Sequence, residues 1–255
     1  MLSLADRARY DRALHVARVA AFAPGELVGQ ESFMTAGEIR ALAARAGIGP
    51  GVAVLDLCCG VGGPGRLIAG ETGCDYLGVD ADPGAVAVAR EHAGDRPSCR
   101  FVIGEVPPLP AGTFDVVLLL ETMLAFADKE ALVRAVGATL RPHGRFAFTL
   151  EEGAPLTPGE RAAMPAADTV WPARLAEIRM VLERAGLRVM WHADHSAAHR
   201  TTAQALTTAF AADAPRIAAQ IGQHALDELL AAHHLWIAWL QAGRIRKLAV
   251  VAERV

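Results

Sequence analysis

The sequence predicts an α/β fold that is doubly wound around a mostly parallel, seven-stranded sheet. Three observations favour this class. Short apolar runs rich in β-branched residues alternate with segments of helical periodicity. The first run, 52–57, leads through a glycine-rich loop into a helix, as at the carboxyl edge of a parallel sheet. With 255 residues, 53% of them apolar, the chain is long enough to bury one sizeable core.

Each element is predicted from its own local signals. Apolar runs predict strands at 52–57, 75–80, 100–103, 114–120, 145–150, 187–191 and 245–252. Helical spacing, with Pro or Asp at the starts and Gly at the ends, predicts helices at 1–22, 36–46, 64–69, 83–90, 129–140 and 171–186. Residues 141–144 are expected to form a turn and 151–170 a loop, because both are rich in Pro and Gly.

The same pattern divides the chain into four parts. Residues 1–46 are expected to form a cap of amino-terminal helices, and 47–195 the core of the α/β fold. Helical periodicity over 196–242 predicts a helical insertion that serves as a lid. Residues 243–255 would then return to the core as its last strand.

Composition narrows the classes of partner and compartment. The net charge of −3 comes without a basic block, which argues against nucleic acid or an anionic membrane as a partner. The four cysteines form no disulfide framework and are interpreted as reduced thiols of a cytoplasmic protein. Charges throughout the amino-terminal segment disfavour a signal peptide, and no apolar run is long enough to span a bilayer.

The glycine-rich loop predicts a nucleoside pocket. Gly60, Gly62 and Gly65 have the spacing G-x-G-x-x-G, which is a weak signal alone. Asp80 follows Gly60 by twenty residues at the tip of the second strand, where an acid can accept both hydroxyls of a ribose. Asp56, immediately before the loop, would repel a pyrophosphate but suits the amino group of a sulfonium amino acid.

Over about residues 36–191 the chain resembles the class I S-adenosylmethionine-dependent methyltransferases. The resemblance depends on Leu55-Asp56, Gly60-Val61-Gly62, Gly78-Val79-Asp80 and Gly104-Glu105, in that order and at that spacing. It implies a Rossmann-like core, S-adenosyl-L-methionine as cofactor and S-adenosyl-L-homocysteine as product. Two positions depart from the family pattern: Cys58 replaces a glycine, and Glu105 replaces an aspartate.

The resemblance also implies roles for individual residues. Asp56 would face the amino group of the cofactor, and the backbone from Cys58 to Gly62 would pass its methionine part. The remaining cofactor contacts would be Asp80 at the ribose, Ala81, Glu105 and Val106 at the adenine, Leu120 and Glu121 near the sulfonium, and Gln30 with Phe33 closing the cofactor edge.

The acceptor side is less defined. Glu121 and His195 are the candidate catalytic residues, and three interpretations of His192, His195 and His199 remain open: a base or donor in the substrate pocket, structural histidines, or a metal site. No metal is expected, because no further ligand is evident. The tryptophans, which all follow residue 170, are expected either to pack in the core or to form an aromatic wall for an apolar substrate. Arg244, Arg246 and Lys247 are expected at a solvated strand end.

The function predicted from these observations is methyl transfer to an oxygen, nitrogen or carbon of a small molecule, mainly by positioning and water exclusion. Two alternatives remain. A non-catalytic or repurposed cofactor-binding protein would keep the same fold. A nicotinamide-dependent dehydrogenase would keep the glycines and Asp80, but it leaves Asp56 and Gly104-Glu105 unexplained.

Overall fold

The computed structural model describes residues 4–165 and 169–255. Residues 1–3 of the predicted first helix and residues 166–168 of the predicted loop lie outside the described residues. Within the described part, no helix combines the length and the apolar character that crossing a membrane requires.

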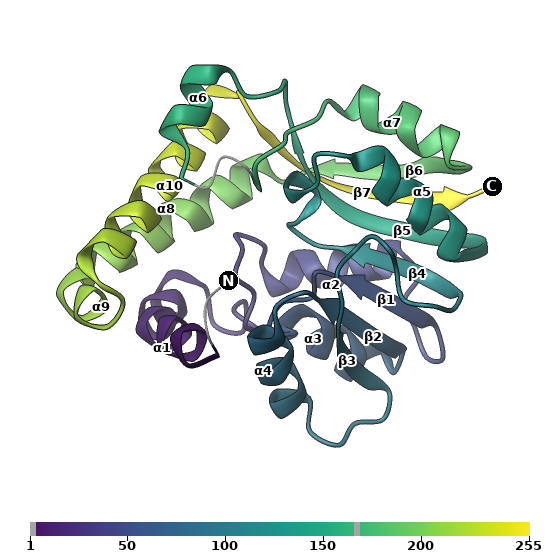
Figure 1. Cartoon of the computed structure of the whole chain (residues 1–255), viewed down its shortest axis with the longest axis horizontal. Coiled ribbons are helices and arrows are strands. Elements are labelled where there is room, and N and C mark those ends of the chain that lie inside the picture. Colours follow the sequence, from purple (N-terminus) through teal and green to yellow (C-terminus); the bar gives the residue numbers. More distant parts are fainter. Residues whose placement is uncertain (1–3, 166–168) are drawn as a thin grey trace.

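The strands form one seven-stranded sheet in the order β3-β2-β1-β4-β5-β7-β6 (Figure 1). The strands are β1 Ala53–Leu57, β2 Asp75–Asp80, β3 Cys99–Ile103, β4 Phe114–Leu119, β5 Leu140–Glu152, β6 Leu187–Asp194 and β7 Arg246–Arg254. Strands β1 to β5 pair in parallel, and β7 lies antiparallel between β5 and β6. The predicted fold class, a doubly wound and mostly parallel sheet of seven strands, is confirmed.

Helices cover both faces of this sheet, and the burial pattern of β1 shows why. Val54 packs with α2, α3 and α4 on one face, while Leu55 and Leu57 pack with α5 and α7 on the other. A strand buried on both faces is typically an almost continuous apolar run, and β1 has this pattern with Asp56 as its one polar residue. The helices are α2 Ala36–Arg45, α3 Gly63–Thr72, α4 Pro83–Ala93, α5 Lys129–Thr139 and α7 Leu175–Arg184.

A separate layer of helices lies beside the sheet, at the left in Figure 1. It consists of α1 Leu4–Ala21, α8 Ser196–Ala212, α9 Ala214–Ile221 and α10 Gln223–Ala242. This helical layer has its own apolar cluster, in which Leu14 of α1 packs with Phe210 of α8 and Leu226 of α10. Helix α2 instead buries Ile39 and Leu42 in the core of the sheet. The two helices of the predicted cap, 1–46, therefore have different packing partners.

Three local predictions were wrong. The expected turn at 141–144 belongs to β5, which begins at Leu140 and continues past a register shift opposite β4. The expected loop 151–170 contains α6, Pro158–Ala163, whose start is stabilised by a capping box between Thr157 and Glu160. The helix expected from residue 171 begins at Leu175, because Ala173 first forms a β-bridge with Glu152.

Candidate functional site

The site lies at the point where the order of the strands in the sheet reverses, between β1 and β4. Strands β1 and β4 are neighbours, but the chain continues from β1 toward β2 and from β4 toward β5, on opposite sides. Connections that diverge in this way leave a crevice at the carboxyl ends of the two strands. The loops after Leu57 and Leu119 border this crevice.

A small cavity, which we call the strand-end pocket, occupies this crevice. Its volume is about 150 Å³. Asp56, Cys58, Gly60, Leu120 and Gln30 all line it, so the structure brings these predicted cofactor-binding residues together. Further lining comes from Gly29, Glu31, Ser32, Met34, Ile39, Cys59, Val61, Pro64, Glu121 and Thr122.

Asp56 is the buried acid of the strand-end pocket. Its side chain is 3% exposed, and its Oδ2 accepts a hydrogen bond of 2.5 Å from the Tyr76 hydroxyl. Burial, with a smaller contribution from the negative charge of nearby Asp80, raises the pKa of Asp56 to about 7, although the hydrogen bond from Tyr76 acts to lower it. A cation bound beside Asp56 would favour the ionised carboxylate.

Two non-glycine residues at the mouth of the pocket have left-handed backbone conformations. Cys58 follows β1 with φ of 57°, and Glu121 follows β4 with φ of 60°. This conformation costs a residue with a Cβ about 1–2 kcal/mol, which explains why a glycine is the easier choice where Cys58 stands. Burial, together with the charges of Asp80 and Asp56, raises the pKa of Cys58 to about 12. The Cys58 thiol is therefore protonated at neutral pH and is a poor nucleophile.

Asp80 organises the glycine loop from the tip of β2. Its Oδ2 accepts the Gly60 N–H at 2.8 Å, and its Oδ1 accepts the Asp82 N–H at 2.9 Å. Ala81 and Glu105 are exposed at the neighbouring strand ends, and neither lines the strand-end pocket. Val106, in the same loop, packs in part against the apolar core. These positions form an open edge beside Asp80.

Gly62 has a packing role in this structure. It is buried with φ of 71°, and a Cβ at this position would lie 2.6 Å from the Phe101 ring. Gly62 does not line the strand-end pocket. Its place in the glycine pattern is therefore explained by the close approach of helix α3 to strand β3.

A larger cavity of about 360 Å³, which we call the helical-layer cavity, lies between the helical layer and the end of the sheet where Glu121, Glu151 and Lys247 are found. Gln30 and Glu121 line both cavities, whereas the predicted cofactor contact Phe33 lines only this one. Its walls are mostly apolar and aromatic, with residues from α1, the segment between α1 and α2, α8 and α10. These include Tyr10, Phe22, Phe33, Leu206, Phe210, Leu229, Ala232, Trp236 and Leu240.

Buried charges form the polar side of the helical-layer cavity. The Lys247 ammonium lies 2.9 Å from Glu121 Oε1 and also contacts the Glu151 carboxylate. Burial raises the pKa of Glu121, but Lys247 and then His199 lower it, and the net direction is downward. Burial lowers the pKa of Lys247, and the two carboxylates raise it above its ordinary value. The Glu121 N–H donates to Thr149 Oγ1 at 2.6 Å, which fixes this residue at the junction of the cavities.

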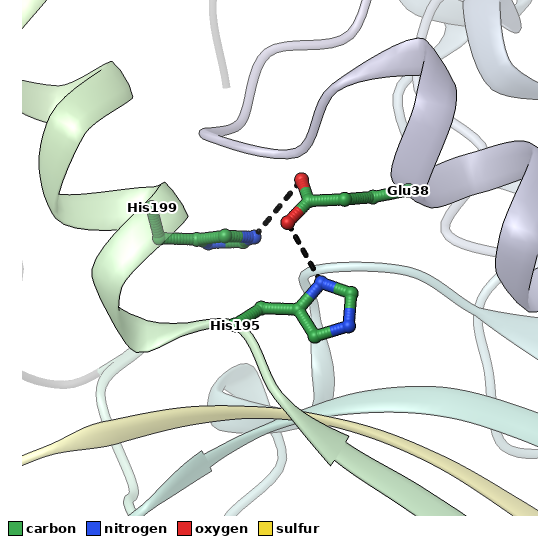
Figure 2. A group of neighbouring side chains, drawn as sticks. All are labelled: Glu38, His195 and His199. Carbon is green, nitrogen blue, oxygen red and sulfur yellow. Dashed lines mark hydrogen bonds and ion pairs between the residues drawn. The ribbon is translucent and has the colours of Figure 1, made fainter.

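Of the predicted histidines, His199 lines the helical-layer cavity and His195 does not. His199 is 1% exposed on α8, and its Nδ1 lies 3.8 Å from Glu121 Oε2. His195 turns toward helix α2, where its Nδ1 lies 2.7 Å from Glu38 Oε1 (Figure 2). His192 is exposed on β6.

Three residues of this polar region were missed or misplaced by the sequence. Lys247 was expected at a solvated strand end, yet it is 6% exposed. Glu151 fell in a predicted loop, although it lies in β5 and is the register partner of Lys247 on the neighbouring strand β7. Glu38 carried only a helix-start signal, the pattern Thr-x-x-Glu of a capping box. No local pattern links these residues, because each meets its partner through the tertiary fold.

Comparisons with known proteins agree with this architecture. Residues 54–144 match the family model described as a methyltransferase domain. Phosphoethanolamine N-methyltransferase 3 of Arabidopsis thaliana is 35% identical over 112 residues, which cover 43% of this chain and 23% of that protein. Methyltransferase GfsG of Streptomyces halstedii is 29% identical over 182 residues, covering 65% of this chain and 63% of that protein.

A solved structure extends the agreement to nearly the whole fold. Cyclopropane synthase MmaA2 of Mycobacterium tuberculosis superposes with a TM-score of 0.81 at 13% identity, covering 96% of this chain and 93% of that one. The chain spans less than a third of the length of the first curated relatives that it matches. The predicted resemblance is confirmed over residues 54–144, which match a methyltransferase domain, and nearly the whole chain has the fold of that solved structure.

Proposed function

We propose that this protein, whose core is a methyltransferase domain, transfers the methyl group of S-adenosyl-L-methionine to a small molecule. One observation carries the proposal: the strand-end pocket and the helical-layer cavity adjoin each other, because Gln30, Glu31, Ser32 and Glu121 line both. Methyl transfer requires a donor and an acceptor held in line with water excluded. Two adjoining cavities of different character provide one compartment for each.

The strand-end pocket is the proposed cofactor site. When bound, the cofactor supplies an activated methyl group on a positively charged sulfur. Among the residues that the structure describes, the Tyr76 hydroxyl is the one hydrogen-bond partner of the buried Asp56 carboxyl, so this carboxyl fits the amino group of the cofactor. The backbone from Cys58 to Gly60 would follow the methionine part, and Asp80 would accept the ribose hydroxyls. The adenine would lie along the open edge formed by Ala81, Glu105 and Val106.

The chemistry of the helical-layer cavity indicates the class of acceptor. Aromatic and aliphatic walls favour a largely apolar molecule, and the polar side favours a single nucleophilic oxygen, nitrogen or carbon directed at Glu121. Glu31 and Glu121 are ionisable groups that line both cavities, and His199 Nδ1 lies 3.8 Å from Glu121 Oε2. If the nucleophile must lose a proton, Glu121 would accept it, and His195 and His199 would act only indirectly.

Calorimetry with S-adenosylmethionine and S-adenosylhomocysteine tests the cofactor site. We expect both to bind at one site per chain. The dehydrogenase alternative would be favoured if neither molecule binds and a reduced nicotinamide cofactor does. Binding of the nicotinamide cofactor is measured by titration, using its own fluorescence. Incubation of a metabolite extract with methyl-labelled cofactor, followed by mass spectrometry, would then identify the acceptor.

A pair of variants on α10 tests the acceptor compartment. Ala232 lines the helical-layer cavity, and the adjacent Ala231 is exposed. We expect Ala232→Trp to fill the cavity and abolish methyl transfer while cofactor affinity stays unchanged. Ala231→Trp should alter neither. Full methyl transfer by the Ala232→Trp variant would place the acceptor elsewhere.

A cytoplasmic location belongs to the same proposal. It is supported by the four cysteines, none of which forms a disulfide.

A further inference from the structure

Glu38, His195 and His199 converge on one point from two separate parts of the chain (Figure 2). Glu38 comes from α2, His195 precedes α8, and His199 lies in its first turn. Glu38 Oε1 is 2.7 Å from His195 Nδ1, and Glu38 Oε2 is 3.5 Å from His199 Nε2. One potential ligand atom from each residue lies within 4.8 Å of the other two.

We propose that these three side chains bind one divalent cation of the zinc class. Two imidazoles and a carboxylate are donors that zinc-class ions accept, whereas magnesium and calcium prefer oxygen ligands alone. A tetrahedral ion with bonds of about 2.0–2.2 Å separates its ligand atoms by about 3.4 Å. Small side-chain rotations would bring the observed separations to that value.

The ligands are oriented by neighbours outside the three. Glu38 Oε2 accepts the Thr35 N–H at 2.8 Å in the capping box of α2, which directs the carboxylate toward the histidines. His199 Nδ1 is buried, has no hydrogen-bond partner within the described part of the chain, and lies 3.8 Å from Glu121 Oε2. A cation on Nε2 would fix the proton on Nδ1, facing this carboxylate, and such carboxylate–histidine pairs support metal ligands in general.

The position of the proposed ion has two consequences. Three protein ligands leave a fourth position open, and His199 also lines the helical-layer cavity. A water molecule can take this position. The ion would also join α2, which packs in the sheet core, to α8 of the helical layer. The proposal depends only on these three side chains and not on the reaction proposed above.

The test is metal binding by the full chain after a chelator has removed any bound ion. Titration with Zn²⁺ by calorimetry should show one equivalent bound, and Zn²⁺ should raise Tm in proportion to the logarithm of its concentration. Co²⁺ in place of Zn²⁺ should give the visible absorption of a four-coordinate site. S-adenosylmethionine binding is measured in parallel, so a failure of the metal-site proposal can be distinguished from a failure of the proposed methyl transfer.

Matched variants decide which residues hold the ion. Glu38→Gln keeps the capping box, because Gln also accepts that role, but removes the anionic ligand. We expect Glu38→Gln and His195→Gln each to weaken Zn²⁺ binding at least about 100-fold, beyond the loss typical of an outer partner. His192→Gln, on the exposed face of β6, should bind as the unchanged protein does.

Any of three results would overturn the proposal. The first is the absence of stoichiometric Zn²⁺ binding by the unchanged protein. The second is an unchanged Zn²⁺ affinity in both Glu38→Gln and His195→Gln, and the third is an equal loss of affinity in His192→Gln. Circular dichroism in the presence of chelator checks that each variant is folded. If one variant does not fold, the other still tests the site, because each removes a different ligand.

Discussion

The strand-end pocket and the helical-layer cavity adjoin each other, yet they are built in different ways. Asp56, Cys58 and Gly60 of the pocket lie within five consecutive residues, and Asp80 reaches them from the next strand. The helical-layer cavity takes residues from α1, the loop after it, β5, α8, α10 and β7. Its polar side joins Glu121, Glu151 and Lys247, which come from three different segments.

The difference teaches why one compartment can be recognised in the sequence and the other cannot. A glycine loop between a strand and a helix is a local structure, so its signal is contiguous. A cavity between helical layers depends on which amphipathic faces meet, and many sequences satisfy the same apolar spacing. The four predictions below test this contrast, beginning with the largest expected effect.

Removing the buried cation should damage the helical-layer side most. Lys247→Met leaves the carboxylates of Glu121 and Glu151 buried without their counter-ion, which typically costs about 3–5 kcal/mol of unfolding free energy. The neighbouring Arg246 makes an exposed ion pair with Glu152, so Arg246→Met should cost only about 0.2–1 kcal/mol. Urea denaturation measures both. Equal losses would show that long-range ion pairing does not hold this cavity together.

Asp80→Ala should have the largest effect on the strand-end side. A carboxylate that accepts two ribose hydroxyls contributes about 1.5–3 kcal/mol for each hydrogen bond, so we expect cofactor affinity to fall at least about 100-fold. The variant also removes the acceptor for the Gly60 and Asp82 N–H groups. Arg246→Ala serves as the control and should leave the affinity unchanged. If both variants weaken binding alike in calorimetry, Asp80 does not hold the ribose.

Gly65→Ala tests the packing beneath the pocket. A Cβ at Gly65 would lie 2.1 Å from ring and hydroxyl atoms of Tyr76, whose hydroxyl donates to Asp56. Such overpacking costs about 1–3 kcal/mol. Gly70 is on the same helix, and a Cβ there meets only the end of the Arg96 side chain at 3.4 Å. Gly70→Ala should therefore stabilise by about 0.5–1 kcal/mol, and thermal unfolding that ranks the two the other way would contradict this packing.

The pH dependence of cofactor binding tests Asp56. Its pKa is higher in the folded protein than in the unfolded chain, so Asp56 binds its proton preferentially in the fold. Its contribution to stability therefore falls as pH rises toward about 7. An ammonium group requires the ionised carboxylate, so cofactor affinity should rise about tenfold per pH unit below pKa 7 and then level off. Calorimetry across this range should give a flat profile for Asp56→Asn. A flat profile for the unchanged protein would separate Asp56 from the amino group.

Sequence and structure agree best where a signal is confined to a few residues. The Asp82 side chain caps α4, as its position before Pro83 predicts, and the continuous apolar run of β1 is buried on both faces. The predicted boundaries were wrong where a neighbour decided them. Leu140 belongs to β5 because Phe114 pairs with it, and α7 begins late because Ala173 bridges to Glu152.

By itself, the sequence determined the doubly wound sheet, the glycine loop and the acids at the tips of β1 and β2. Backbone propensity, helix capping and apolar periodicity act over short distances, so these features are written in adjacent residues. Only the tertiary structure decided that Glu38 meets His195, 157 residues away, and that Lys247 is buried against Glu121. Burial and charge pairing depend on which surfaces of the fold come together, and no local pattern specifies that.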